Sequence, residues 1–189
     1  MRSVLALGTF LLLLLTVAAA ARPAPGTIPA PNLPDITVQT QDGTTVPFAD
    51  LIRDRTVAIN FVFTSCTTIC PLMGTSFGRV QDLLGDQAKD VALISVSIDP
   101  EHDTPAKLTA WSKRFGVRPG WTLVTGRKPD IERLLRSLGV FTPNFLQHAP
   151  VAIIGRESRG VWRRLDGLAP PSKFVSVIRD VASTENASR

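Results

Sequence analysis

The sequence predicts an α/β domain in which a central mixed β-sheet is flanked by helices, with an extra hairpin at its N-terminal side. Apolar, strand-like runs alternate with amphipathic segments through the middle of the chain, and a hairpin and a last helix follow them. The 189 residues are 44% apolar and 20% charged, which is enough for the core of one soluble domain. Each element has its own local signal.

The first elements are a hairpin, a strand and a helix. Residues 36–38 and 44–46 flank an Asp-Gly pair that is typical of a tight turn. Residues 57–63 (VAINFVF) are apolar throughout, as in a buried strand. Pro71 opens a predicted helix over 71–84, because a proline costs little in the first turn.

Turn and cap residues place the remaining elements. A second buried strand covers 91–98, and Thr104 with Pro105 caps a helix that Gly116 ends. The last elements that we expect are a strand at 121–124, a helix at 129–138, a hairpin of 151–154 with 161–165, and a helix at 172–181. In such open sheets, ligand sites lie at the carboxyl ends of the central strands.

Both ends of the chain differ from this domain, which we place at residues 36–182. Residues 1–21 read as a secretory signal peptide, with Arg2 before an apolar stretch and four alanines at 18–21. The sequence therefore predicts a periplasmic protein. An uncleaved anchor that keeps the domain near the membrane is the alternative, and the absence of cysteines in this region excludes a lipoprotein. We expect a proline-rich tether at 22–35 and a disordered tail at 183–189.

The charge pattern points away from nucleic acid. The net charge of +5 falls to +4 without residues 1–21, and the basic residues are scattered along the chain with no interleaved aromatics. We read them as a solvated surface with a mild positive bias. Weak attraction to anionic lipid headgroups or to an acidic partner stays open.

Cys66 and Cys70 are the only cysteines, and they follow the first buried strand directly. With three residues between them, the two cysteines would make a weak structural disulfide, because closing a short loop stabilises little. The helix that starts at Cys70 should favour the thiolate form and lower the cysteine pKa. Such a pair can form a redox-active disulfide or bind a soft metal ion.

His148 decides between these chemistries. It stands just before the 151–154 strand, whose entry loop we expect to lie over the cysteines. Two thiolates and an imidazole suit copper, above all Cu(I), or zinc. His102 is expected in a solvent-facing loop that Asp99 and Asp103 order by short bonds to the backbone. Met73 is expected in the core, or else as a sulfur close to the metal.

These residues resemble the Sco (SenC) copper-chaperone family. The resemblance covers residues 35–182 and lies in FTSCTTICP (63–71), in SIDPEHDTP (97–105) and in the late His148. It implies a thioredoxin-like fold, copper held by Cys66, Cys70 and His148, and delivery to the binuclear copper centre of cytochrome c oxidase. It also implies a role in reducing that centre's cysteines. The tyrosine and aspartate that the family often has before the histidine are absent here.

Three interpretations follow. The first is a periplasmic copper carrier, serving the copper-bearing subunit of cytochrome c oxidase or another copper protein. The second is a metal-independent thiol–disulfide oxidoreductase, with a thiol reductant or a copper donor as a further partner. The third is a structural domain with an inert Cys66–Cys70 disulfide. A peroxidase of the peroxiredoxin type is disfavoured by the second nearby cysteine and by His148.

Overall fold

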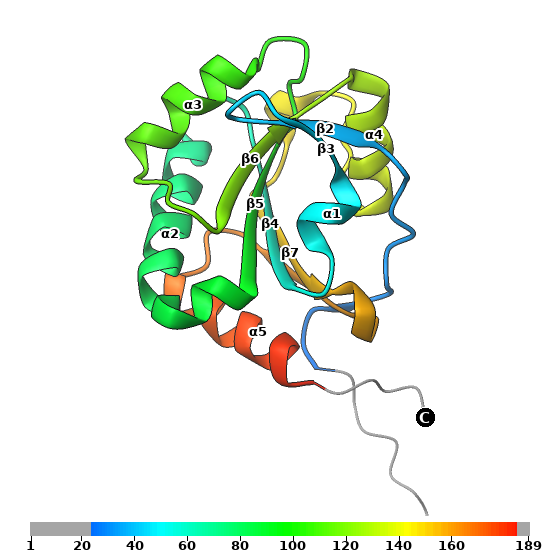
Figure 1. Ribbon diagram of the computed structural model, residues 1–189, viewed down its shortest axis with the longest axis vertical. Coiled ribbons are helices and arrows are strands. Elements are labelled where there is room, and N and C mark those ends of the chain that lie inside the picture. Colours follow the sequence, from blue (N-terminus) through cyan, green and yellow to red (C-terminus); the bar gives the residue numbers. More distant parts are fainter. Residues whose placement is uncertain (1–23, 185–189) are drawn as a thin grey trace, which may run out of the picture.

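The computed structural model describes residues 24–184, which form an eight-stranded mixed sheet covered by helices on both faces (Figure 1). The strand order is β1-β8-β7-β4-β5-β6-β2-β3. At its centre, β4 (Thr56–Val62) runs parallel to β5 (Val91–Ser97) and antiparallel to β7 (Val151–Arg156). The next strand, β6 (Trp121–Thr125), is parallel to β5. The α/β fold with a central mixed sheet is confirmed.

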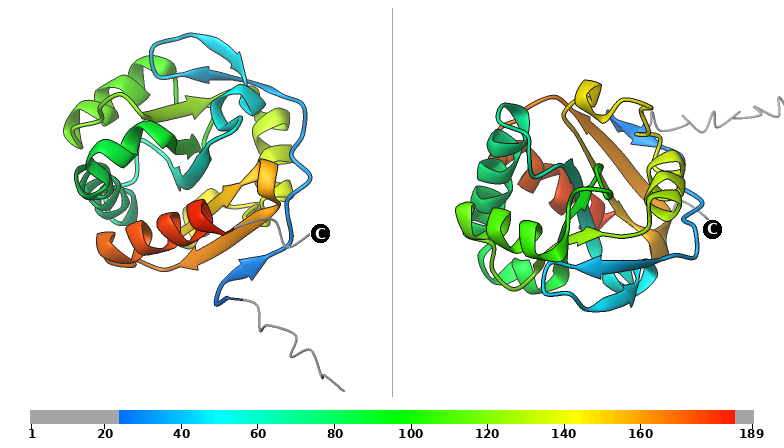
Figure 2. Two further views of the ribbon diagram at one scale, coloured as in Figure 1. Left: turned by 60° about the horizontal axis from the view of Figure 1, so that its bottom comes forward. Right: turned by 90° about the horizontal axis from the view of Figure 1, so that it is seen from above.

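The helices are the crossovers that parallel strands require. One face of the sheet is covered by α2 (Ile69–Leu84), α3 (Pro105–Arg114) and α5 (Pro171–Ser183), and the other by α1 (Phe48–Ile52) and α4 (Lys128–Ser137) (Figure 2). The helix α2 starts two residues earlier than the sequence suggests, so Cys70 lies inside its first turn. No helix between residues 24 and 184 has the length and apolarity that a membrane span requires.

The edges of the sheet hold the main differences from expectation. The hairpin of β2 (Thr37–Thr40) and β3 (Thr45–Pro47) forms as predicted and extends the sheet beyond β6. The proline-rich segment, however, supplies β1 (Thr27–Ile28), which pairs with β8 (Val161–Asp166), so this part of the expected tether is held on the domain. The short helix α1 had no sequence signal that we recognised.

Short 3₁₀ turns and the chain ends complete the description. The turns are Gly85–Asp90, Phe145–Gln147 and Glu157–Arg159. Ser183, the first residue of the expected tail, still belongs to α5. The expected signal peptide at 1–21, residues 22–23 of the tether and residues 185–189 of the tail lie outside the described residues.

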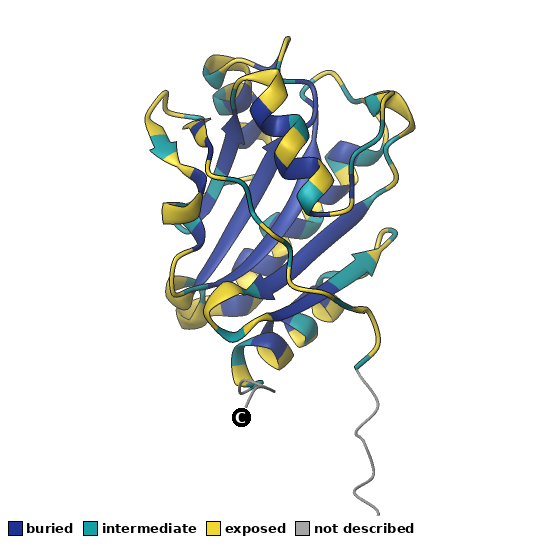
Figure 3. Ribbon diagram, turned by 90° about the vertical axis from the view of Figure 1, so that its right-hand side faces the viewer, coloured by how far each residue is buried: buried dark blue, intermediate teal, exposed yellow. Residues whose placement is uncertain are grey.

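The core lies between the sheet and its helices, and all seven residues of both β4 and β5 are buried (Figure 3). Phe77 of α2 contacts both Trp121 of β6 and Phe174 of α5, at ring-centroid distances of 5.8 and 5.6 Å. This packing holds the middle of α2 against the sheet and against α5, and the first turn of α2 follows the carboxyl end of β4 after a short loop. The two cysteines are therefore carried by rigid elements on both sides.

One glycine in β7 shows how tightly the sheet is packed. A Cβ atom at Gly155 would lie 2.1 Å from Cε3 of Trp162, whose side chain is 1% exposed. We expect Gly155→Ala to lower the free energy of unfolding by about 3 kcal/mol, because the buried indole must shift. Urea denaturation measures this value. The control is Gly126→Ala, where the nearest atoms would lie at 3.5 Å and the change should stay within about 1 kcal/mol. Equal losses in both variants would contradict the packing argument.

Candidate functional site

The end of β4 and the start of α2 position the two thiols. The backbone N–H of Cys66 donates to the carbonyl oxygen of Phe63 (3.1 Å), which turns the chain out of the strand. At the start of α2, the N–H of Cys70 donates to the sulfur of Cys66 (3.3 Å). Both cysteines are free; Cys66 is partly exposed, whereas Cys70 is buried. The sulfur of the partly exposed Cys66 thus receives a hydrogen bond from the first turn of α2, in which the buried Cys70 lies.

This arrangement gives the thiols opposite pKa shifts. Burial acts to raise the pKa of Cys66, but hydrogen bonds from the backbone of Cys70, Thr68 and Ile69 and from the Cys70 thiol outweigh it, and the pKa falls below its ordinary value. Burial also raises the pKa of Cys70, here to about 12, with the neighbouring Cys66 and Asp103 adding to the rise. The expectation that the helix start lowers the cysteine pKa therefore holds for Cys66 and is wrong for Cys70.

His148 lies over the same end of the sheet. The backbone N–H of His148 donates to the carbonyl oxygen of Phe145 (3.1 Å). The centroid of its imidazole ring lies 5.6 Å from that of the Phe61 ring. Burial lowers the pKa of His148, and the charge of Arg164 lowers it further. The imidazole is therefore neutral at pH 7, which is the form that binds metals.

A small cavity brings the predicted donors together. Its volume is about 70 Å³, and Cys66, Cys70, Met73 and His148 all line it. Between residues 24 and 184, however, no three His, Cys, Asp or Glu side chains stand close enough together to hold a metal ion. The donors face one space without forming a finished coordination site, so the ligand set remains a prediction.

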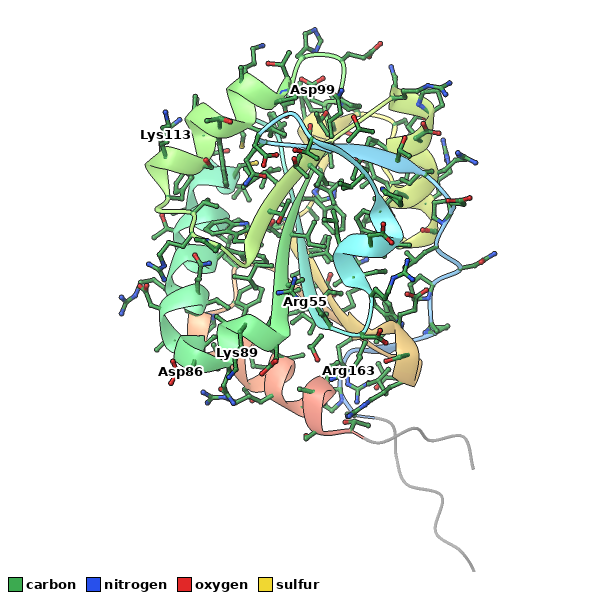
Figure 4. The ribbon with its side chains drawn as sticks, in the orientation of Figure 1. Arg55, Asp86, Lys89, Asp99, Lys113 and Arg163 are labelled. Atoms are coloured by element: carbon green, nitrogen blue, oxygen red, sulfur yellow. The ribbon has the colours of Figure 1, made fainter. Side chains whose placement is uncertain are left out.

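The other candidates lie around this cavity in different ways. Met73 is 2% exposed and borders the cavity, so it belongs to the core and to the cavity wall at once. The side chain of His102 is 70% exposed and pairs with Asp99 through Nδ1 (2.8 Å). It is not among the residues that line the cavity. Asp99 follows β5 and lies at the end of the sheet where the parallel strands β4 and β5 finish (Figure 4).

The Asp103 carboxylate bonds to a residue that is distant from it in the sequence, which the sequence did not indicate. Its carboxylate is 2% exposed and accepts hydrogen bonds from the N–H of Thr64 (3.1 Å), the Thr64 hydroxyl (2.5 Å) and the Ser97 hydroxyl (2.7 Å). The expectation that Asp103 orders its own loop through short bonds to the backbone is wrong, because this carboxylate instead ties the cysteine loop to the end of β5. It therefore sets where Cys66 leaves the strand.

Sequence reasoning also missed the aromatic wall of the site. Phe61 of β4 and Phe63, which directly follows β4, line the cavity, and the ring of Phe63 meets that of Phe145 edge to face at 5.0 Å. The two-residue spacing of Phe61 and Phe63 places both on one face of a strand, which was a usable signal. An apolar wall of this kind limits the contact of the buried Cys70 with water, whereas Cys66 stays partly exposed.

Fold and site together define a thioredoxin-like domain with a thiol pair at the carboxyl end of a central strand and a histidine facing it. The chain belongs to the SCO1/SenC family, whose model matches residues 33–182. The resemblance seen in the sequence is confirmed.

Curated relatives agree with this assignment. The SCO1 protein homolog of Bacillus subtilis is 36% identical over 91 residues, which are 48% of this chain and 47% of that protein. Protein SenC of Rhodobacter capsulatus is 30% identical over 119 residues, 63% of this chain and 52% of that protein. The chain thus spans about half the length of the curated relatives that it matches.

Solved structures share the fold. BsSco, a member of the Sco family of cytochrome c oxidase assembly proteins for which a disulfide switch is described, superposes with a TM-score of 0.71 at 23% identity, covering 85% of this chain and 98% of BsSco. Copper-bound ScoI of Arabidopsis thaliana gives 0.66 at 20% identity, covering 80% and 98%. Copper-bound yeast Sco1 gives 0.67 at 17% identity, covering 89% and 99%.

Proposed function

We propose that this protein is a periplasmic copper carrier that binds copper through Cys66, Cys70 and His148. The first candidate recipient is the copper-bearing subunit of cytochrome c oxidase, and another copper protein is the alternative. The observation behind the proposal is a cavity that Cys66, Cys70, His148 and Met73 line together. Soft sulfur donors with an imidazole select Cu(I). Copper-bound relatives of the same fold support it.

The donors differ in how readily they bind. His148 is neutral at pH 7, which is the form that binds metals, and the lowered pKa of Cys66 favours its thiolate. Cys70, with its pKa at about 12, must release a proton when the metal binds. We infer transfer by ligand exchange in which His148 dissociates first and the two sulfurs hand the ion to the recipient. The predicted signal peptide supports a periplasmic location.

Titration of the reduced protein with Cu(I) tests the ligand set. We expect one tightly bound ion, and His148→Ala should weaken binding by at least the roughly 10–100-fold that loss of a residue supporting a ligand costs. X-ray absorption should show one nitrogen donor fewer. The matched control is His102→Ala, since that imidazole lies outside the cavity. Unchanged affinity and coordination number in His148→Ala would exclude this histidine as a ligand.

A second candidate function, thiol–disulfide exchange, is favoured by the unequal thiols. The Cys66 thiolate would attack a sulfur of a partner disulfide to give a mixed disulfide. Cys70, after losing its proton, would then attack Cys66 and release the partner as a dithiol, so the pair gives up two electrons and becomes the Cys66–Cys70 disulfide. Fast reduction of a model disulfide by protein that binds no copper would favour this function over the carrier.

A further inference from the structure

The fold gathers basic residues that look scattered in the sequence. Residues 71–84 and 104–120, which hold most of α2, all of α3 and the loop after α3, contain five basic side chains and one acidic side chain. The basic ones are Arg79, Lys107, Lys113, Arg114 and Arg118, and the acidic one is Asp82. This flank therefore has a net charge of +4, whereas the whole chain has +5. Figure 4 shows Lys113 on this flank.

A groove of about 310 Å³ lies on this flank between α2 and the loop after α3. We call it the arginine groove, and define it by Thr75, Arg79, Asp82, Arg114, Phe115 and Arg118, which line it. At about 1.5 Å per residue, Arg79 lies roughly 13 Å from Cys70 along the axis of α2. The groove and the thiols thus share one rigid helix.

Close packing and hydrogen bonds hold the walls of the arginine groove in place. A Cβ atom at Gly78 would lie 2.9 Å from the carbonyl oxygen of Phe115, and one at Gly74 would lie 2.8 Å from its ring. The glycines therefore let the loop sit directly on α2. Gln81, which is 4% exposed, donates to the carbonyl oxygens of Arg118 (3.0 Å) and Pro119 (3.1 Å) and accepts from the N–H of Arg118 (3.2 Å). A preordered surface of this kind loses little entropy on binding.

The arginines are spaced to hold carboxylates. Asp82 already accepts from Arg79 (3.0 Å) and Arg118 (2.7 Å), one arginine on each oxygen. Within residues 24–184, Arg114 forms no ion pair, and its guanidinium carbon lies 5.7 Å from the centre of the Phe115 ring. One acid among three arginines leaves the groove with a surplus charge of +2.

The exposed face of α2 indicates which kind of partner fits. Leu72 (52% exposed) and Leu83 (46% exposed) lie in line with Arg79, at spacings of seven and four residues along α2. The two leucines lie on the same face of α2 as the groove without lining it, and this combination suits a protein segment that carries both carboxylates and apolar side chains. It offers little apolar area for a flat bilayer.

The geometry points to the arginine groove as the docking site for an acidic segment of a partner protein. A partner held there would lie along the second half of α2, and a part of it that extends roughly 13 Å toward the start of the helix could reach Cys66. The inference rests on the proposed function in one respect. It assumes that the protein docked in the groove is also the partner on which the two thiols act.

The test uses the full-length protein and fluorescein-labelled hexaglutamate at low salt, with hexaglutamine as the neutral peptide. We expect hexaglutamate to raise the fluorescence anisotropy and to shift the amide signals of residues 75–82 and 114–118, and hexaglutamine to do neither. Arg79→Glu combined with Arg114→Glu should weaken binding about tenfold, or about 1.4 kcal/mol. Lys89→Glu combined with Lys173→Glu, an equal charge change at exposed lysines outside the groove, should change it less than twofold.

Three outcomes would overturn the inference. They are no binding of hexaglutamate, equal weakening by both double variants, and tight binding of phosphatidylglycerol vesicles through Arg79 and Arg114 without binding of the peptide. Thermal unfolding shows whether each variant is folded. Cu(I) titration of the Arg79→Glu/Arg114→Glu variant separates this inference from the proposed function, because neither arginine lines the cavity and copper affinity should not change.

Discussion

Brief treatment of the reduced protein with iodoacetamide at pH 8 is expected to alkylate Cys66 and to leave Cys70 intact. The thiolate is the reacting form. A shift of the Cys70 pKa from 9.0 to about 12 lowers its thiolate fraction about 1,000-fold. Burial is the main cause of this shift, and it also blocks access to the sulfur. Cys66 has a lowered pKa and a partly exposed side chain, so both factors act in its favour.

Peptide mass spectrometry after timed pulses from pH 6 to pH 11 gives the two rates. The unfolded protein in guanidinium is the control, because its two thiols should react alike. The rate for Cys66 should reach half of its plateau at a pH below 9, because the pKa of Cys66 is lowered. Cys70 should still react more slowly than its unfolded counterpart at pH 11. Equal rates in the folded protein would show that the thiols are equivalent, and would remove the argument for a separate attacking cysteine in disulfide exchange.

Local pattern was enough to predict most of the fold. The strands β4 and β5 are continuous apolar runs, and proline and glycine mark the ends of α3 and α4, so their order and the mixed sheet follow from the sequence. The position of the cysteines also follows, because a thiol pair directly after a buried strand has to lie at the carboxyl end of the sheet. The segments that were missed, β1 and α1, span only two and five residues and depend on contacts with distant parts of the chain.

The site was harder to predict, because its properties arise from burial and from long-range contacts. The reasoning about the helix start treated Cys66 and Cys70 alike. Cys70 is 5% exposed, however, and desolvation outweighs the favourable backbone groups around it. The link from Asp103 to Thr64 joins residues 39 apart in the sequence, and no local pattern reveals it. The gathering of charge on α2 and α3 likewise appears only once the two helices lie side by side.

Removal of the Asp103 carboxylate is expected to be among the most destabilising single changes near the site. Asp103→Ala leaves the Thr64 N–H and the hydroxyls of Thr64 and Ser97 without their acceptor. Unpartnered donors of this kind cost about 1–3 kcal/mol each when buried, and Thr64 can still reach some water, so we expect a loss of about 3 kcal/mol in the free energy of unfolding. Urea denaturation of the reduced protein measures it.

Two further variants separate the shape of Asp103 from its charge. Asp103→Asn keeps one acceptor oxygen, so its loss should be smaller, about 1–2 kcal/mol. Asp99→Asn is the matched control, since the Asp99 carboxylate pairs only with the exposed His102 among the described residues, and its loss should stay below about 1 kcal/mol.

The alkylation assay then reports on the cysteine loop itself. The charge of Asp103 adds to the effect of burial in raising the pKa of Cys70, so Asp103→Asn should lower that pKa and speed the alkylation of Cys70. Asp99→Asn should leave both cysteine rates unchanged. If Asp103→Asn and Asp99→Asn had the same small effect on stability and on both rates, the carboxylate of Asp103 would be an ordinary buried acid. Its bonds to Thr64 would then have no part in holding the loop from which Cys66 meets its partners.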